Sequence, residues 1–106
     1  MNLQKMLKQA QEMQSKITEV QSRLEAESYE GQSGGGMVKV SISGKGLAQK
    51  VAIDDSLMAV SEKEMLEDLI VAAFNDANTH REGNFSEQMS KITAGLPLPP
   101  GFKLPV

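Results

Sequence analysis

Gly34–Gly46 reads GGGMVKVSISGKG, and this segment separates two unlike halves of the chain. Between its glycine clusters, Val38, Val40 and Ile42 alternate with polar residues. A strand has a side-chain period of two, so this alternation places the aliphatic side chains on one face of a sheet and the polar ones on the other. The segment therefore predicts a strand held between two turns.

A second alternation of apolar and polar residues over 47–54 follows Gly44-Lys45-Gly46, which predicts a β-hairpin. Either glycine of that turn could supply the positive φ that a tight hairpin needs. The triple glycine breaks the chain on the other side, so Tyr29–Gln32 is expected to form a short edge strand. Residues 27–54 are thus predicted to form a three-stranded antiparallel sheet.

The composition favours a small globular domain. We expect the 106 residues to form a single domain that buries about 60 to 70% of its unfolded surface. Seven Met and only four aromatic residues suggest an aliphatic core, and the absence of Cys excludes disulfides and cysteine chemistry. The opening residues contain no continuous apolar run, so neither a signal peptide nor a membrane span is expected, and a cytoplasmic location follows.

The charge is distributed unevenly along the chain. The net charge is −3, which argues against an indiscriminate nucleic-acid binder. Residues 1–53 nevertheless carry seven Lys or Arg against five Glu, whereas residues 54–106 carry nine acids against four bases. One end of the protein could therefore meet a polyanion while the other repels it.

Residues from Asn2 to about Ala26 include no Gly or Pro and predict one long helix. Its apolar residues are spaced alternately by three and four, as in a heptad repeat, at Leu3, Met6, Ala10, Met13, Ile17, Val20 and Leu24. About 25 helical residues span roughly 37 Å, whereas a compact globule of this size has a radius of gyration of about 13 Å. The helix is therefore expected to project as an arm whose apolar seam is covered by a second helix, from the same chain or another protomer.

The polar side of this arm carries most of the positive charge of the first half. One sector about 80° wide holds Lys5, Lys8, Glu12, Lys16, Glu19 and Arg23. The neighbouring sector holds Gln4, Gln11, Ser15, Thr18 and Ser22. For the four later charged residues we favour a solvated face, with i,i+4 ion pairs from Glu12 to Lys16 and from Glu19 to Arg23.

Lys5 and Lys8 are placed differently, at the N-terminal end of the arm. There the helix dipole disfavours cations by about 0.3 to 1 kcal/mol. Such unfavourable placement hints at a use, because two ammonium groups and the free N–H groups of a first helical turn would together favour a phosphate. Chance placement is the alternative.

The second half predicts helices over 61–94. Ser61 and Glu64 have the spacing of a capping box, and apolar residues then recur at helical spacing to about residue 80. The acidic residues at the start of that helix suit its dipole and need no catalytic explanation. Gly83-Asn84 interrupts the pattern, and Asn84 with Glu87 has the spacing to cap a new helix over Phe85–Ala94, so we expect a kinked or broken helix. His80, the only histidine, is expected at the surface and in no metal site or catalytic triad.

Residues 95–106 cannot be helical, because four prolines remove backbone donors and fix φ. We expect an extended, polyproline-like tail. Its apolar residues, Leu96, Leu98, Phe102 and Leu104, suggest that it docks on the protein itself. The alternative is a ligand for a proline-binding domain.

Four blocks in order make the chain similar to the YbaB/EbfC family of small bacterial nucleoid-associated proteins. They are MLKQAQEM at 6–13, GGMVKV at 35–40, EMLEDLIVAAFNDA at 64–77 and LPPGFK at 98–103. The resemblance implies an α/β (α+β) homodimer in which long helices project like tweezers. It also implies DNA binding and a role in organising the nucleoid, without catalysis. The family offers no sharp DNA-contact motif, so candidate contacts depend on the charge argument.

We therefore expect a dimer whose arms straddle double-stranded DNA. Nothing in the arm is suited to reading base edges, so binding should follow phosphate geometry and duplex shape, with little sequence specificity. The candidate contact residues are Lys5, Lys8, Lys16, Arg23, Gln4, Gln11, Ser15 and, more weakly, Lys91. No cofactor, metal, membrane or small-molecule substrate is expected. The alternative is a protein-interaction module that grips a partner helix or an unfolded chain through its exposed seam and Met-rich surface.

Overall fold

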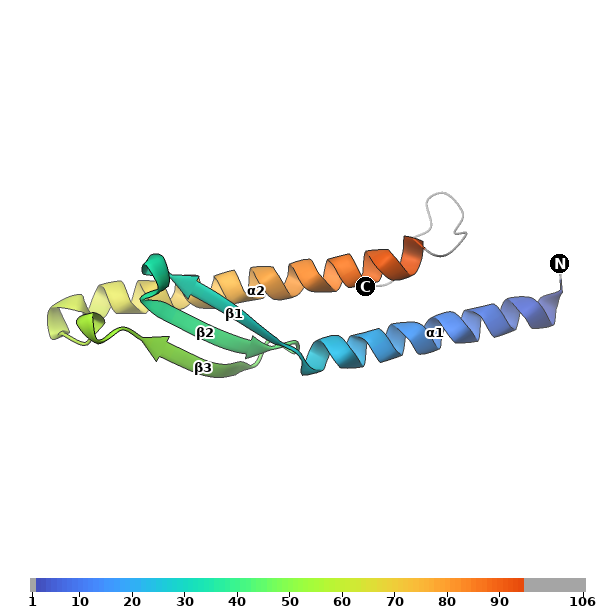
Figure 1. Ribbon diagram of the computed structural model, residues 1–106, viewed down its shortest axis with the longest axis horizontal. Helices are drawn as coiled ribbons and strands as arrows, with labels where there is room; N and C mark the ends of the chain where they lie inside the picture. Colours follow the sequence, from blue (N-terminus) through green and yellow to red (C-terminus); the bar gives the residue numbers. More distant parts are fainter. Residues whose placement is uncertain (1, 95–106) are drawn as a thin grey trace.

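Residues 2–94 are described in the computed structural model of the chain (Figure 1). The expected order of a long helix, three strands and a C-terminal helical region is confirmed. The elements are α1 (Leu3–Ala26), β1 (Ser28–Ser33), β2 (Val38–Ser43), β3 (Ala48–Ile53) and α2 (Lys63–Ala94), with 3-10 turns at Gly34–Gly36, Asp55–Leu57 and Val60–Glu62. The prediction of an extended tail over 95–106 lies outside the described residues.

The three strands form one antiparallel sheet in the order β1-β2-β3. Val40 at its centre pairs with Gly31 on one side and with Val51 on the other. In the hairpin between β2 and β3, Gly46 has the positive φ, +83°, and Gly44 does not. The hairpin and the edge strand before the triple glycine are thus confirmed, and the turn residue is Gly46.

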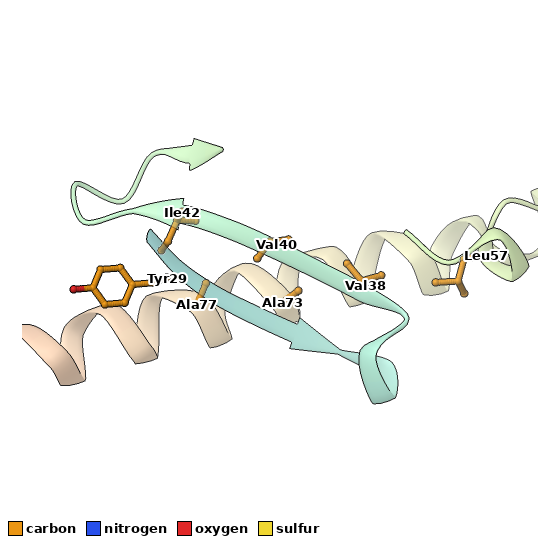
Figure 2. Packing of buried hydrophobic residues seen from close by; sticks show 7 residues of the cluster. All are labelled: Tyr29, Val38, Val40, Ile42, Leu57, Ala73 and Ala77. Atoms are coloured by element: carbon orange, nitrogen blue, oxygen red, sulfur yellow. The ribbon is translucent and has the colours of Figure 1, made fainter. Parts of the chain in front are cut away.

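One face of the sheet packs on α2, and the core lies between them (Figure 2). The buried side chains are Tyr29, Val38, Val40, Ile42, Leu57, Ala73 and Ala77. A Cβ atom at Gly31 would overlap the backbone of Ala73 and Ala77, so glycine at this position lets β1 lie directly against the helix. The predominantly aliphatic core agrees with the composition.

The outer edge of β1 is covered by two side chains of α2, one helical turn apart. Asp76 accepts a hydrogen bond from the backbone N–H of Gln32 at 3.0 Å, and His80 Nδ1 lies 2.7 Å from the carbonyl oxygen of Glu30. Because a carbonyl only accepts, Nδ1 carries the hydrogen. His80 is a surface residue, as expected, but it also helps satisfy an otherwise open strand edge.

Between β3 and α2 the chain turns through two short 3-10 segments. The Asp54 carboxylate accepts a hydrogen bond from the backbone N–H of Ser56 at 2.9 Å. That bond, supported by the Ser56 hydroxyl, holds the pKa of Asp54 below its ordinary value. The turn directs Leu57 into the core beneath the start of α2.

The expected projection of α1 is confirmed. The molecule measures 70 × 25 × 16 Å, and its radius of gyration is 19.8 Å, well above the value of about 13 Å for a compact chain. In Figure 1, α1 runs away from the sheet and past the end of α2. A second cluster, centred on Leu24, Met89 and Ile92, joins the two helices. The seam is therefore covered in part by α2 of the same chain.

The expected break at Gly83-Asn84 is wrong, because α2 runs without interruption from Lys63 to Ala94. Asn84 does not cap a new helix. Its side-chain amide donates to the Tyr29 hydroxyl at 2.7 Å, which ties the middle of α2 to the sheet. Beyond it, Met89 and Ile92 are buried against α1. This packing outweighs the cost of about 1 kcal/mol for one helical glycine.

The predicted capping box is also wrong. Ser61 lies inside the 3-10 turn Val60–Glu62, and α2 begins at Lys63. Ala59, whose side chain has no oxygen, stands at the N-cap of that turn. The Ser61–Glu64 spacing therefore located the start of the helix to within two residues, but the capping-box hydrogen bonds that it predicted do not form.

Candidate nucleic-acid interface on the arm

The tip of the arm presents two lysines to solvent. Asn2 caps α1 by accepting a hydrogen bond from the Gln4 backbone N–H at 2.9 Å, so that N–H is not free for a phosphate. The first turn of α1 holds no acidic residue. Lys5 and Lys8 are both exposed, and within residues 2–94 no carboxylate lies within ion-pair distance of either. Their charge is therefore available to a partner.

The middle of the arm does not contain the expected ladder of ion pairs. Glu12 and Lys16 form no salt bridge, and neither do Glu19 and Arg23; both predictions are wrong. Lys16 is exposed and, like the two lysines of the tip, has no carboxylate of residues 2–94 within ion-pair distance. The neutral candidates Gln4, Gln11 and Ser15 are exposed as well.

Arg23 is exposed, but it lies at the root of the arm, next to α2. Its guanidinium donates to Gln88 Oε1 at 3.3 Å and so links α1 to α2. Lys91, on the last turn of α2, lies 3.6 Å from Glu87, and both side chains are about two-thirds exposed. These two cations are therefore partly engaged within the protein, and the freest charges are those of Lys5, Lys8 and Lys16.

The helix sets the spacing of these charges along the arm. At 1.5 Å per residue, Lys5 and Lys8 are separated by about 4.5 Å along the axis, and Lys16 follows about 12 Å further on. The whole row from Lys5 to Arg23 extends over about 27 Å. Phosphates along one DNA strand recur about every 3.4 Å of axis, so a row of this length can meet several of them.

Sequence reasoning did not assign two further exposed cations, Lys39 on β2 and Lys50 on β3. Lys50 pairs with Ser41, two residues along β2 from Lys39, so both lysines lie on the sheet face opposite the core. The alternation over 38–43 could have predicted that Lys39 lies on this face, since it placed the polar side chains of the strand together. This second cationic pair gives a matched control for experiments on the arm.

The described residues offer little to a cofactor or a metal. A shallow recess of about 260 Å³ lies at the edge of β1, lined in part by Glu30, Lys39, Asp76 and His80. Asp76 and His80 already bind the edge of β1. Over residues 2–94 no group of three His, Cys, Asp or Glu side chains could hold a metal ion, and no helix is long and apolar enough to cross a membrane.

The fold and the arm define a small α+β protein with a projecting helix whose tip is cationic, and comparison places it in a family. Residues 1–96 match the YbaB/EbfC DNA-binding family. The chain therefore belongs to the YbaB/EbfC DNA-binding family, as the four sequence blocks indicated.

Two relatives support this assignment. A protein of Methylocella silvestris named as a nucleoid-associated protein is 52% identical over 100 residues, which cover 94% of each chain. The crystal structure of an uncharacterized protein from Helicobacter pylori matches with a TM-score of 0.72 at 26% identity, over 88% of this chain and 98% of the other. The long helix, three-stranded sheet and second helix are therefore an arrangement found in a solved structure.

Proposed function

We propose that this protein binds duplex DNA through the exposed cationic row of α1 and acts as a nucleoid-associated protein in the cytoplasm. The observation that carries the proposal is the set of three uncompensated lysines, Lys5, Lys8 and Lys16, on a helix that projects from the body. Membership of a DNA-binding family supports it, and the name of the Methylocella silvestris relative supports a role in the nucleoid. We propose no catalytic role.

Binding depends on phosphates and has little sequence specificity. A lysine ammonium is a compact charge that suits phosphate oxygens, whereas bidentate recognition of guanine is best performed by arginine. Arg23 is the one arginine of the arm, and Gln88 holds it at the root. Gln4, Gln11 and Ser15 add neutral hydrogen bonds to the backbone.

A single arm touches one side of a duplex, and straddling it requires a second copy. β3 is an edge strand, and its side chains are exposed almost throughout because α2 packs chiefly over β1 and β2. Leu47 before it is 63% exposed, and Val51 within it is 41% exposed. Open backbone groups beside exposed apolar side chains favour pairing with another chain. We propose that β3 and its flanking residues form the interface of a homodimer.

The salt dependence of affinity tests the electrostatic mechanism. If about four phosphates are neutralised, the logarithm of the association constant should fall against the logarithm of salt concentration with a slope near −3.6. The measurement is a fluorescence-anisotropy titration of a labelled duplex from about 50 to 200 mM salt. Affinity that does not change with salt would rule out binding through the lysine row.

The second candidate function is a protein-interaction module, and a specific observation favours it. Leu3, Met6 and Leu7 are exposed at the tip of α1, and a partner helix could pack on them. A pull-down from nuclease-treated lysate beside a mobility shift assay at physiological salt separates the two functions. Retention of a protein partner together with no DNA shift would favour the module.

A further inference from the structure

The apolar seam of α1 continues beyond the part that α2 covers. Leu24 is fully buried at the root, and Met13, Ile17 and Val20 pack against the cluster that joins the two helices. At the tip the same side of α1 presents Leu3, Met6 and Leu7, which are 68%, 45% and 56% exposed. A continuous stripe is thus covered over one half of the helix and bare over the other.

The length of α2 explains where the cover ends. The two helices run antiparallel (Figure 1), and the hydrogen bond from Arg23 to Gln88 aligns them. Six residues further along α2 is its last residue, Ala94, and six residues back along α1 is Ile17. Met13, one turn nearer the tip than Ile17, still packs against the cluster that joins the helices. Among residues 2–94, the ten residues from Leu3 to Glu12 therefore leave about 15 Å of α1 with no helix beside it.

The chain that follows Ala94 suits this bare stripe in length and composition. Residues 95–106 hold four prolines, five apolar residues (three Leu, Phe102 and Val106) and a single charged side chain, at Lys103. An extended proline-rich segment rises about 3.1 Å per residue, so these twelve residues can span about 37 Å. This exceeds the roughly 15 Å of uncovered helix. Proline also reduces the entropy lost when such a segment becomes ordered.

We propose that residues 95–106 dock along the uncovered stripe of α1 in the same chain, where Leu96, Leu98 and Phe102 cover the apolar residues of the tip. The buried Ile92 brings the end of α2 against α1, so the segment begins next to its binding surface. A tethered segment has an effective concentration in the millimolar range, which favours it over a free partner. The stripe lies about a third of a turn from the sector of Lys5 and Lys8, so docking leaves both lysines accessible.

Hydrogen exchange of the full chain tests whether the segment covers the tip. The test variant is Leu98→Ser/Phe102→Ser, and the control is Lys103→Ser, which changes the same segment without removing apolar contact. Backbone amides of residues 6–12 should exchange at least about tenfold faster in the test variant and at the wild-type rate in the control. Equal exchange in all three proteins would overturn the proposal.

Paired cysteines test whether the occupant comes from the same chain, because the protein has no cysteine of its own. Met6→Cys is combined in separate proteins with Leu96→Cys, Leu98→Cys and Phe102→Cys, and Val71→Cys on an exposed site of α2 replaces Met6→Cys in the control. Mild oxidation should form an intrachain disulfide in at least one test pair and none in the control. Exclusive formation of interchain disulfides, or no disulfide in any test pair, would refute docking within one chain.

Discussion

Gly44 lies where the sheet meets the root of the arm. A Cβ atom there would overlap the Leu24 carbonyl and approach Glu25 Cα to 2.5 Å, and the Gly44 N–H donates to the Glu27 carbonyl at 2.9 Å. The hairpin turn is thus pressed against the last turn of α1. This contact helps hold the direction in which the arm leaves the body.

Gly44→Ala should therefore destabilise the protein by about 3 kcal/mol, the upper part of the range for overpacking, because neither backbone can move aside freely. Urea denaturation followed by circular dichroism measures the change. The neighbouring exposed Lys45→Ala is the control and should change the free energy of unfolding by less than about 0.5 kcal/mol. If Gly44→Ala were as stable as the control, the two backbones would have room for a methyl group and the proposed overpacking would be wrong.

At the scale of single residues, the sequence indicated a flexible turn but not its tertiary contacts. The spacing of Gly44 and Gly46 left open which of them has the positive φ, and it could not show that the other touches α1 twenty residues earlier in the chain. Likewise, the Glu12–Lys16 spacing permits an ion pair, but long exposed side chains gain little from holding one geometry. The spacing of residues in the sequence shows which contacts are possible, whereas tertiary packing determines which of them form.

At the scale of elements, α2 shows how tertiary contacts override a local signal. Asn84 bonds to Tyr29, and the apolar residues beyond it pack on α1, so the helix continues through Gly83. Gly83 itself faces open space, because a Cβ atom placed there would meet no atom within 4 Å. The glycine is therefore an intrinsic weakness of α2 that no close contact requires.

Gly83→Ala should stabilise the protein by about 0.5 to 1 kcal/mol, because alanine has the higher helix propensity and restricts the unfolded chain. Thermal unfolding followed at 222 nm, with an expected rise of several degrees, measures it. Ser86→Ala, three residues later on an exposed position of the same helix, serves for comparison and should shift the midpoint less. A lowered midpoint for Gly83→Ala would mean that the helix needs its flexibility here.

The arm and the sheet could be predicted because their signals are long and periodic. The seam of α1 repeats over seven turns without a breaker, and β2 alternates cleanly between two turns. The apolar seam predicted that a second helix packs on α1, but it could not identify that helix as α2 of the same chain. The sequence contains no local signal for the contact of Asp76 and His80 with the edge of β1, because those residues lie more than forty positions from the strand.

At the scale of the whole molecule, one chain has the shape of half a clamp: a body with an open edge strand and one long arm. Val51→Lys places a charge on the exposed apolar side of β3 and should dissociate the proposed dimer, because pairing would bury an unpaired ammonium. Sedimentation equilibrium should give twice the chain mass of 11.5 kDa for the wild type and 11.5 kDa for the variant.

Ala52→Lys on the opposite face of β3 is the control for that experiment and should leave the dimer intact. A wild-type protein that stays monomeric at micromolar concentration would contradict the dimer itself. Dissociation by Ala52→Lys alone would instead locate the interface on the polar face of the sheet.

The central claim is that the tip of the arm holds DNA, and two charge-matched double variants test it most directly. Lys5→Glu/Lys8→Glu reverses the charges at the tip, and Lys39→Glu/Lys50→Glu makes the same change in net charge on the open face of the sheet. For a short duplex at about 100 mM salt, the dissociation constant of the tip variant should rise by about tenfold or more, while that of the sheet variant changes by less than about threefold. Unchanged affinity of the tip variant, or an equal loss in the sheet variant, would contradict the account.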